Sequence, residues 1–139
     1  SLSAGLTEEA GFRGYGLVPL QKRYGPVLAN IIISVLFVLF HLNQAWAPPL
    51  LLHLFVASFM FGAIAYASGS LLPGIIAHTV LDIVNFSYWW TDVAGRFEYH
   101  PIAITGMDLH FLVWSVLLTV SGVLFVWVLG KVKAVRLQS

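Results

Sequence analysis

The chain has 139 residues, of which 59% are hydrophobic and only 9% carry a charge. Soluble domains have about a quarter of their residues charged, so this composition argues against a water-soluble globular protein. The net charge of +1 leaves no basic stripe to neutralise nucleic-acid phosphates, and the absence of cysteine removes disulfides and thiolate chemistry.

The length fits one domain over residues 1–139 rather than two. The first residue is Ser1 rather than Met, and we expect the chain to be a fragment of a larger membrane protein with further spans upstream. The alternative is a soluble all-α core, which would have to bury its apolar segments against one another with almost no charged surface.

The first expected helix covers about residues 6–20 and carries two adjacent acids, Glu8 and Glu9, followed by Arg13. Residues four apart lie on one helix face, and an acid that precedes a base by four residues is in the better order for an ion pair. Glu9 and Arg13 are therefore expected to pair and to support this helix. Glu8 points about 100° away and remains available as a proton acceptor. The simpler alternative is a solvated helix end with no catalytic role.

Four apolar runs follow this helix, and each is near the ~20 residues that cross a bilayer. They extend over about residues 26–42, 48–67, 71–90 and 109–129. We therefore predict an all-α fold, a polytopic helical membrane bundle of four transmembrane spans plus the acid-bearing helix.

Basic residues stand at both ends of the four runs. Lys22 and Arg23 precede the first run, and the segment from Lys131 to Arg136 follows the fourth. Four spans bring both clusters to the same side, which the positive-inside rule makes the cytoplasmic side. We expect a multi-pass integral membrane protein whose loop over about residues 91–108 lies on the opposite side.

Ionisable residues lie inside these runs, where they are costly and usually functional. His41 ends the first run, one turn after Phe37, and His78 and Asp82 share a helix face in the third. Asn85 extends the same face. The simpler interpretations are an interfacial histidine at position 41 and a hydrogen-bond ladder between helices for the polar stripe.

A serine nucleophile has one candidate, in Tyr66-Ala67-Ser68-Gly69. This segment is similar to the nucleophile motif of rhomboid proteases, but Tyr66 stands where that motif has glycine. Ser68 also falls at the end of an apolar run, where serine and glycine commonly break a helix. A rhomboid-like serine protease therefore remains a weaker alternative.

Taken in order, Glu8-Glu9-x-x-x-Arg13, Phe37-x-x-x-His41 and His78-x-x-x-Asp82 resemble the three motifs of the CAAX protease and bacteriocin-processing (CPBP, Abi) family of intramembrane proteins. The resemblance covers about residues 8–86. It implies an α-helical intramembrane endopeptidase, embedded in membrane lipid, that cleaves a lipidated or membrane-bound peptide without a covalent intermediate.

The resemblance also implies roles for the motif residues. Glu8 would be the general base that activates a water together with His41, and His78 and Asp82 would bind the oxyanion and the substrate carbonyl. The family often has asparagine in place of Asp82, and an ionised aspartate would repel an oxyanion. We therefore expect Asp82 to orient His78, with Asn85 as a secondary source of an amide donor.

No catalytic metal is expected. Zinc is the alternative, held by Glu8, His41 and His78, with Asp82 fixing the tautomer of His78. Against it, no two of these three ligands share a predicted helix. A function of a different class is also open: a catalytically silent bacteriocin-immunity or scaffolding protein that binds a partner through the same buried polar cluster.

Overall fold

The computed structural model describes residues 2–44, 48–89, 104 and 106–137. Within these ranges the regular elements are all helical, as predicted. The chain divides into two compact units, residues 1–83 and residues 84–139. The first unit contains the three motifs that carry the family resemblance.

The N-terminal segment of the first unit is helical throughout residues 2–24, longer at both ends than the predicted 6–20. It consists of α1 (Leu2–Glu8), the π-helix η1 (Glu9–Leu17) and α2 (Val18–Tyr24). Wide π turns are rare and often mark functional sites, and the three glycines of η1 lower the steric cost of the unusual winding. The acid pair stands where the α winding changes to the π winding.

The next helices match the predicted apolar runs closely. Helix α3 (Pro26–Phe40) starts with proline in the first turn, after Gly25 at φ 78°, and ends two residues before the predicted boundary. A 3₁₀ turn, η2 (Leu42–Gln44), follows it. Helices α4 (Pro48–Ser68) and α5 (Leu72–Val84) contain the second run and most of the third.

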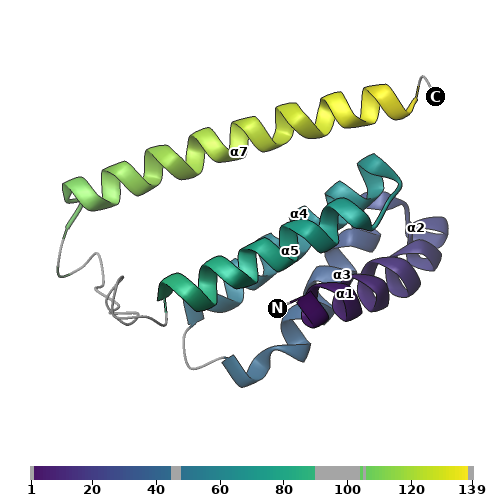
Figure 1. Ribbon diagram of the computed structural model, residues 1–139, viewed down its shortest axis with the longest axis horizontal. Helices are drawn as coiled ribbons and strands as arrows, with labels where there is room; N and C mark the ends of the chain where they lie inside the picture. Colours follow the sequence, from purple (N-terminus) through teal and green to yellow (C-terminus); the bar gives the residue numbers. More distant parts are fainter. Residues whose placement is uncertain (1, 45–47, 90–103, 105, 138–139) are drawn as a thin grey trace. The chain divides into compact units, whose positions relative to one another are not determined.

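In the first unit, α3 packs against η1, α2 and α4 (Figure 1). The apolar core joins Leu17 of η1 to Ala29 and Ile33 of α3. On the α4 side, the Asn30 side chain donates a hydrogen bond to the carbonyl of Phe59 at 2.9 Å. This packing brings η1, α3 and α4 together around the residues of the acid pair.

Within the described residues, two helices are long and apolar enough to cross a membrane, over Leu50–Ser68 and Phe111–Arg136. Pro26–Phe40 and Leu72–Ser87 are apolar but shorter. Large apolar side chains on the outer face of α3, such as Val27 and Val35, are about half exposed, which suits contact with lipid. Two of the four predicted spans therefore reach the required length, and the four-span topology stays a prediction.

The second unit contains η3 (Asn85–Trp89) and α7 (Leu109–Arg136). Asp108 caps α7, because its Oδ1 accepts a hydrogen bond from the amide of Phe111 at 2.8 Å. Helix α7 continues seven residues past the predicted end at 129, through the basic cluster. Most of the loop predicted over residues 91–108 lies outside the described residues.

Candidate active site

Glu9 and Arg13 form the ion pair that their spacing predicted. Oε1 of Glu9 lies 3.2 Å from Nη1 of Arg13, and both side chains are fully buried. Desolvation lowers the pKa of Arg13, while the negative charges of Glu9 and, more weakly, Glu8 raise it. Because arginine stays protonated in proteins, the pair places a fixed positive charge beside the Glu9 carboxylate.

Arg13 is held on its other side by helix α4. Its Nη2 donates to the hydroxyl of Ser58 at 2.6 Å and to the carbonyl of the same residue at 2.9 Å. The guanidinium also lies 5.1–5.8 Å from the ring centroids of Phe12, Phe37 and Phe61, within the range of cation–π attraction. Sequence reasoning missed Ser58, since a single serine in an apolar run has no partner at helical spacing.

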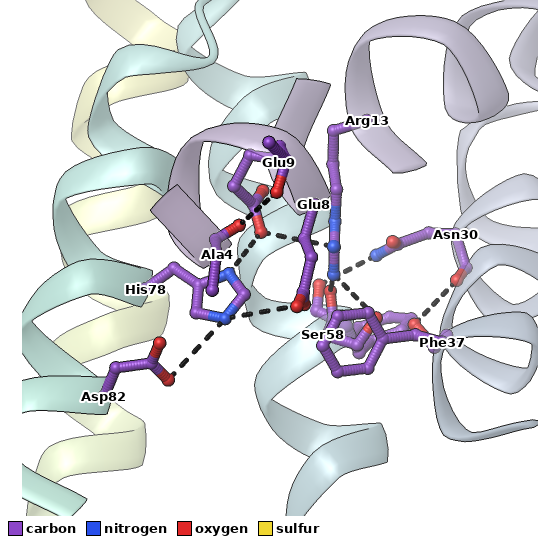
Figure 2. A network of polar contacts seen from close by, with 12 residues as sticks. Ala4, Glu8, Glu9, Arg13, Asn30, Phe37, Ser58, His78 and Asp82 are labelled. Carbon is purple, nitrogen blue, oxygen red and sulfur yellow. Dashed lines mark hydrogen bonds and ion pairs between the residues drawn. The ribbon is translucent and has the colours of Figure 1, made fainter. Parts of the chain in front are cut away.

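His78 projects from α5 toward the acid pair, and its ring is buried and stacked on Phe61 with centroids 4.8 Å apart. Its Nδ1 lies 2.9 Å from Oε1 of Glu9. A carboxylate that is paired with arginine accepts hydrogen bonds, so Nδ1 of His78 carries the proton. Figure 2 shows the opposite ring nitrogen, Nε2, directed between Glu8 and Asp82.

The residue that orients His78 differs from the one expected. Asp82 was predicted to fix the ring, but its Oδ1 lies 3.8 Å from Nε2, whereas Glu9 holds Nδ1 at 2.9 Å. The spacing of four residues along α5 does bring Asp82 beside the imidazole. The closer partner comes from a different helix, 69 positions away in the chain, and helical spacing cannot reveal such a contact.

His41 lies directly after the last residue of α3. Its Nδ1 is 2.8 Å from the carbonyl oxygen of Phe37, and its ring stacks on the Phe37 ring with centroids 4.4 Å apart. A carbonyl oxygen can only accept, so Nδ1 is the protonated nitrogen. In the neutral ring, Nε2 is therefore an acceptor, and it faces Glu8 at 3.9 Å.

Oε2 of Glu8 thus lies between two imidazole nitrogens, 3.9 Å from His41 and 3.8 Å from His78. These separations are too long for direct hydrogen bonds, and this buried oxygen has no hydrogen-bond partner in the described structure. Polar atoms separated by such distances are commonly bridged by water. Across the described residues, no group of three or more histidines and acids has the arrangement of a metal site.

Two further candidates are Asn85 and Ser68. Asn85 is the first residue of η3 and belongs to the second unit. The hydroxyl of Ser68 donates to the carbonyls of Ile64 and Ser70, at 2.8 and 3.1 Å. Such bonds to nearby backbone are the usual role of serine at a helix end, so the geometry gives no support to Ser68 as a nucleophile.

A family model described as Rce1-like type II CAAX prenyl endopeptidase matches residues 1–84 of the chain. The matched region covers more than half of the sequence and includes the three motifs from Glu8 to Asp82. No curated protein and no solved structure shows significant similarity to the chain.

Proposed function

The chain belongs to the family of Rce1-like type II CAAX prenyl endopeptidases, and from this membership we propose that it hydrolyses a peptide bond in a lipidated or membrane-associated peptide. The observation that carries the proposal is the position of the Glu8 carboxylate, with Oε2 facing Nε2 of His41 and Nε2 of His78. Each of these rings has its other nitrogen held, by Phe37 and by Glu9 respectively.

In the proposed reaction, a water molecule between Glu8 and His41 donates one hydrogen bond to each of these acceptors. Glu8 removes a proton as the water oxygen bonds to the scissile carbonyl carbon, which gives a tetrahedral oxyanion. Glu8 then returns the proton to the amine nitrogen as the carbon–nitrogen bond breaks. Proton transfer by a positioned group contributes about 10²–10⁴-fold to such reactions.

His78 is the proposed stabiliser of the oxyanion. With Nδ1 held by Glu9, the ring can donate through Nε2 only when it is doubly protonated. That form places a positive charge and an N–H donor at the substrate carbonyl, the arrangement that most favours a developing oxyanion. The carboxylate of Asp82 lies 3.8 Å from the same nitrogen.

The proposed setting is a membrane, with four spans and with both basic clusters on the cytoplasmic side. The two helices of spanning length and the exposed apolar side chains of α3 support this placement. A substrate anchored by its own lipid would then be concentrated in the plane of the bilayer that contains Glu8.

The test uses the purified protein in lipid nanodiscs, with a fluorogenic peptide that ends in a prenylated CAAX sequence and with the same peptide lacking the prenyl group. Wild-type protein is expected to release the C-terminal fragment, identified by mass spectrometry, and to prefer the prenylated peptide. Glu8→Gln keeps the size of the side chain and removes the base, so cleavage should fall at least 100-fold. Unchanged cleavage by Glu8→Gln would overturn the mechanism, and a biological effect that survives this substitution would favour the immunity or scaffolding function.

A further inference from the structure

Ser58 lies in the middle of α4 and is fully buried. It belongs to none of the three motifs, yet it contributes two oxygens to the polar network around Arg13 (Figure 2). Its hydroxyl makes the shortest of these contacts, at 2.6 Å.

A continuous series of polar contacts leads from this serine to the imidazole of His78. Nη2 of Arg13 binds Ser58, and Nη1 of the same guanidinium lies 3.2 Å from Oε1 of Glu9. That carboxylate oxygen is also the partner of Nδ1 of His78, at 2.9 Å. The orientation of His78 therefore depends on where Arg13 holds Glu9.

Apart from the ion pair with Glu9 and the three nearby aromatic rings, the guanidinium has few polar contacts. Its Nε and Nη1 make no hydrogen bond of good geometry in the described structure, so the two contacts with Ser58 are its well-formed hydrogen bonds. A guanidinium is planar and rigid, so Nη2 cannot move without carrying Nη1 away from Glu9. Loss of the Ser58 hydroxyl would thus allow the Glu9 carboxylate to move. This carboxylate is the hydrogen-bond acceptor that orients the imidazole of His78.

We propose that Ser58 is a positioning residue of the active site: through Arg13 and Glu9 it keeps the proton of His78 on Nδ1 and directs Nε2 toward Glu8. The catalytic consequence rests on the proposed function, in which Nδ1–H of the doubly protonated ring stays bound to Glu9 while Nε2–H donates to the oxyanion. The effect on the tautomer of the neutral ring does not rest on it. The two parts can therefore be tested separately.

Ser34 provides the matched control. It is a second fully buried serine, on α3, and its hydroxyl donates to the carbonyl of Asn30 at 2.8 Å, within its own helix. Ser58→Ala and Ser34→Ala each remove one buried hydroxyl. We expect similar decreases in Tm for the two variants. In the peptide assay we expect kcat to fall about tenfold for Ser58→Ala at unchanged KM, and less than about twofold for Ser34→Ala.

The second measurement needs no activity. In ¹⁵N-histidine spectra of the full chain, at a pH where the ring is neutral, wild-type His78 should have a protonated Nδ1 and an unprotonated Nε2. Its signals are assigned by their loss in His78→Asn. Ser58→Ala should populate the other tautomer, and Ser34→Ala should not. Ser58→Cys, which keeps a side chain of similar size with a weaker hydrogen-bonding group, is measured in the same way in case the alanine variant does not fold.

The outcomes separate the two proposals. A shifted tautomer in the Ser58 variants supports the positioning role, even where no peptide is cleaved by any form of the protein. An unchanged tautomer in the Ser58 variants, with kcat equal to that of Ser34→Ala, overturns the role while leaving the proposed hydrolysis intact.

Discussion

Oε1 of Glu9 lies 2.9 Å from Nδ1 of His78, and the same oxygen lies 3.2 Å from Nη1 of Arg13. The second acid of the pair thus connects the N-terminal helix to α5 and fixes which nitrogen of the imidazole carries the proton. The first acid, Glu8, is left with its Oε2 free of hydrogen bonds in the described structure and facing both histidines. We therefore infer different roles for these two adjacent glutamates: Glu9 in positioning and Glu8 in the proposed chemistry.

Substitutions of the two acids should differ in their effect on stability. Glu9→Gln leaves the buried guanidinium of Arg13 without its anionic partner, and a broken buried ion pair costs about 3–5 kcal/mol. We expect a large decrease in the free energy of unfolding, measured by denaturant titration in detergent micelles, and a loss of cleavage with it. Glu8 is partly exposed, so Glu8→Gln should lower the unfolding free energy by less than about 1 kcal/mol. Equal destabilisation by the two substitutions would contradict this division.

Asp82→Asn should preserve cleavage. The amide is nearly isosteric with the carboxylate, it is common at this position in the family that the motifs resemble, and it can donate a hydrogen bond to an oxyanion. Since Glu9 already fixes Nδ1 of His78, the ring does not lose its orientation. We expect kcat within about tenfold of wild type, corresponding to about 1.4 kcal/mol.

Asp82→Ala is the comparison for that substitution. It removes both the charge and any donor beside Nε2 of His78, so its kcat should be lower than that of Asp82→Asn. If Asp82→Asn proves as inactive as Glu8→Gln, the negative charge of Asp82 is itself required. The contact with Glu9 would then not be enough to orient His78 for cleavage.

The helices and the contact within the acid-bearing helix could be predicted from the sequence, because both depend on local patterns. The apolar runs gave α3 and α4 to within two residues at each end, and the spacing of four gave the contact of Glu9 with Arg13. The π winding of η1 could not be predicted in this way, because the spacing argument assumes the period of an α-helix.

Contacts between helices were the part that the sequence did not reveal. Ser58 and Glu9 both contribute through partners at least 45 positions away along the chain, and a single sequence contains no signal for such pairs. Asp82 was expected to orient His78 for the same reason. It lies four positions away in the sequence, whereas the contact with Glu9 leaves no trace in the helical pattern.

The membrane topology gives a prediction that is independent of the site. With four spans, reporters fused after Arg23 and after Arg136 should both be cytoplasmic, and a reporter at position 95 should lie on the opposite side. Paired alkaline phosphatase and fluorescent-protein fusions at each position provide the measurement. Reporters after Arg23 and at position 95 on the same side would require an even number of spans between them and would exclude this topology.

Metal dependence is the remaining choice, and we expect water activation without zinc. Zinc binds nitrogen and oxygen ligands at about 2.0–2.2 Å, so tetrahedral ligands lie about 3.3–3.6 Å apart, closer than the 3.8–3.9 Å between Glu8 and either histidine. The hydrogen bonds at Nδ1 of His41 and His78 resemble those that orient histidine ligands of zinc. The same hydrogen bonds can equally direct Nε2 of each ring toward a water molecule. We expect purified, active protein to contain less than stoichiometric zinc and to keep its kcat after treatment with a chelator. Stoichiometric zinc, with activity lost on its removal and regained on its return, would instead assign Glu8, His41 and His78 as ligands.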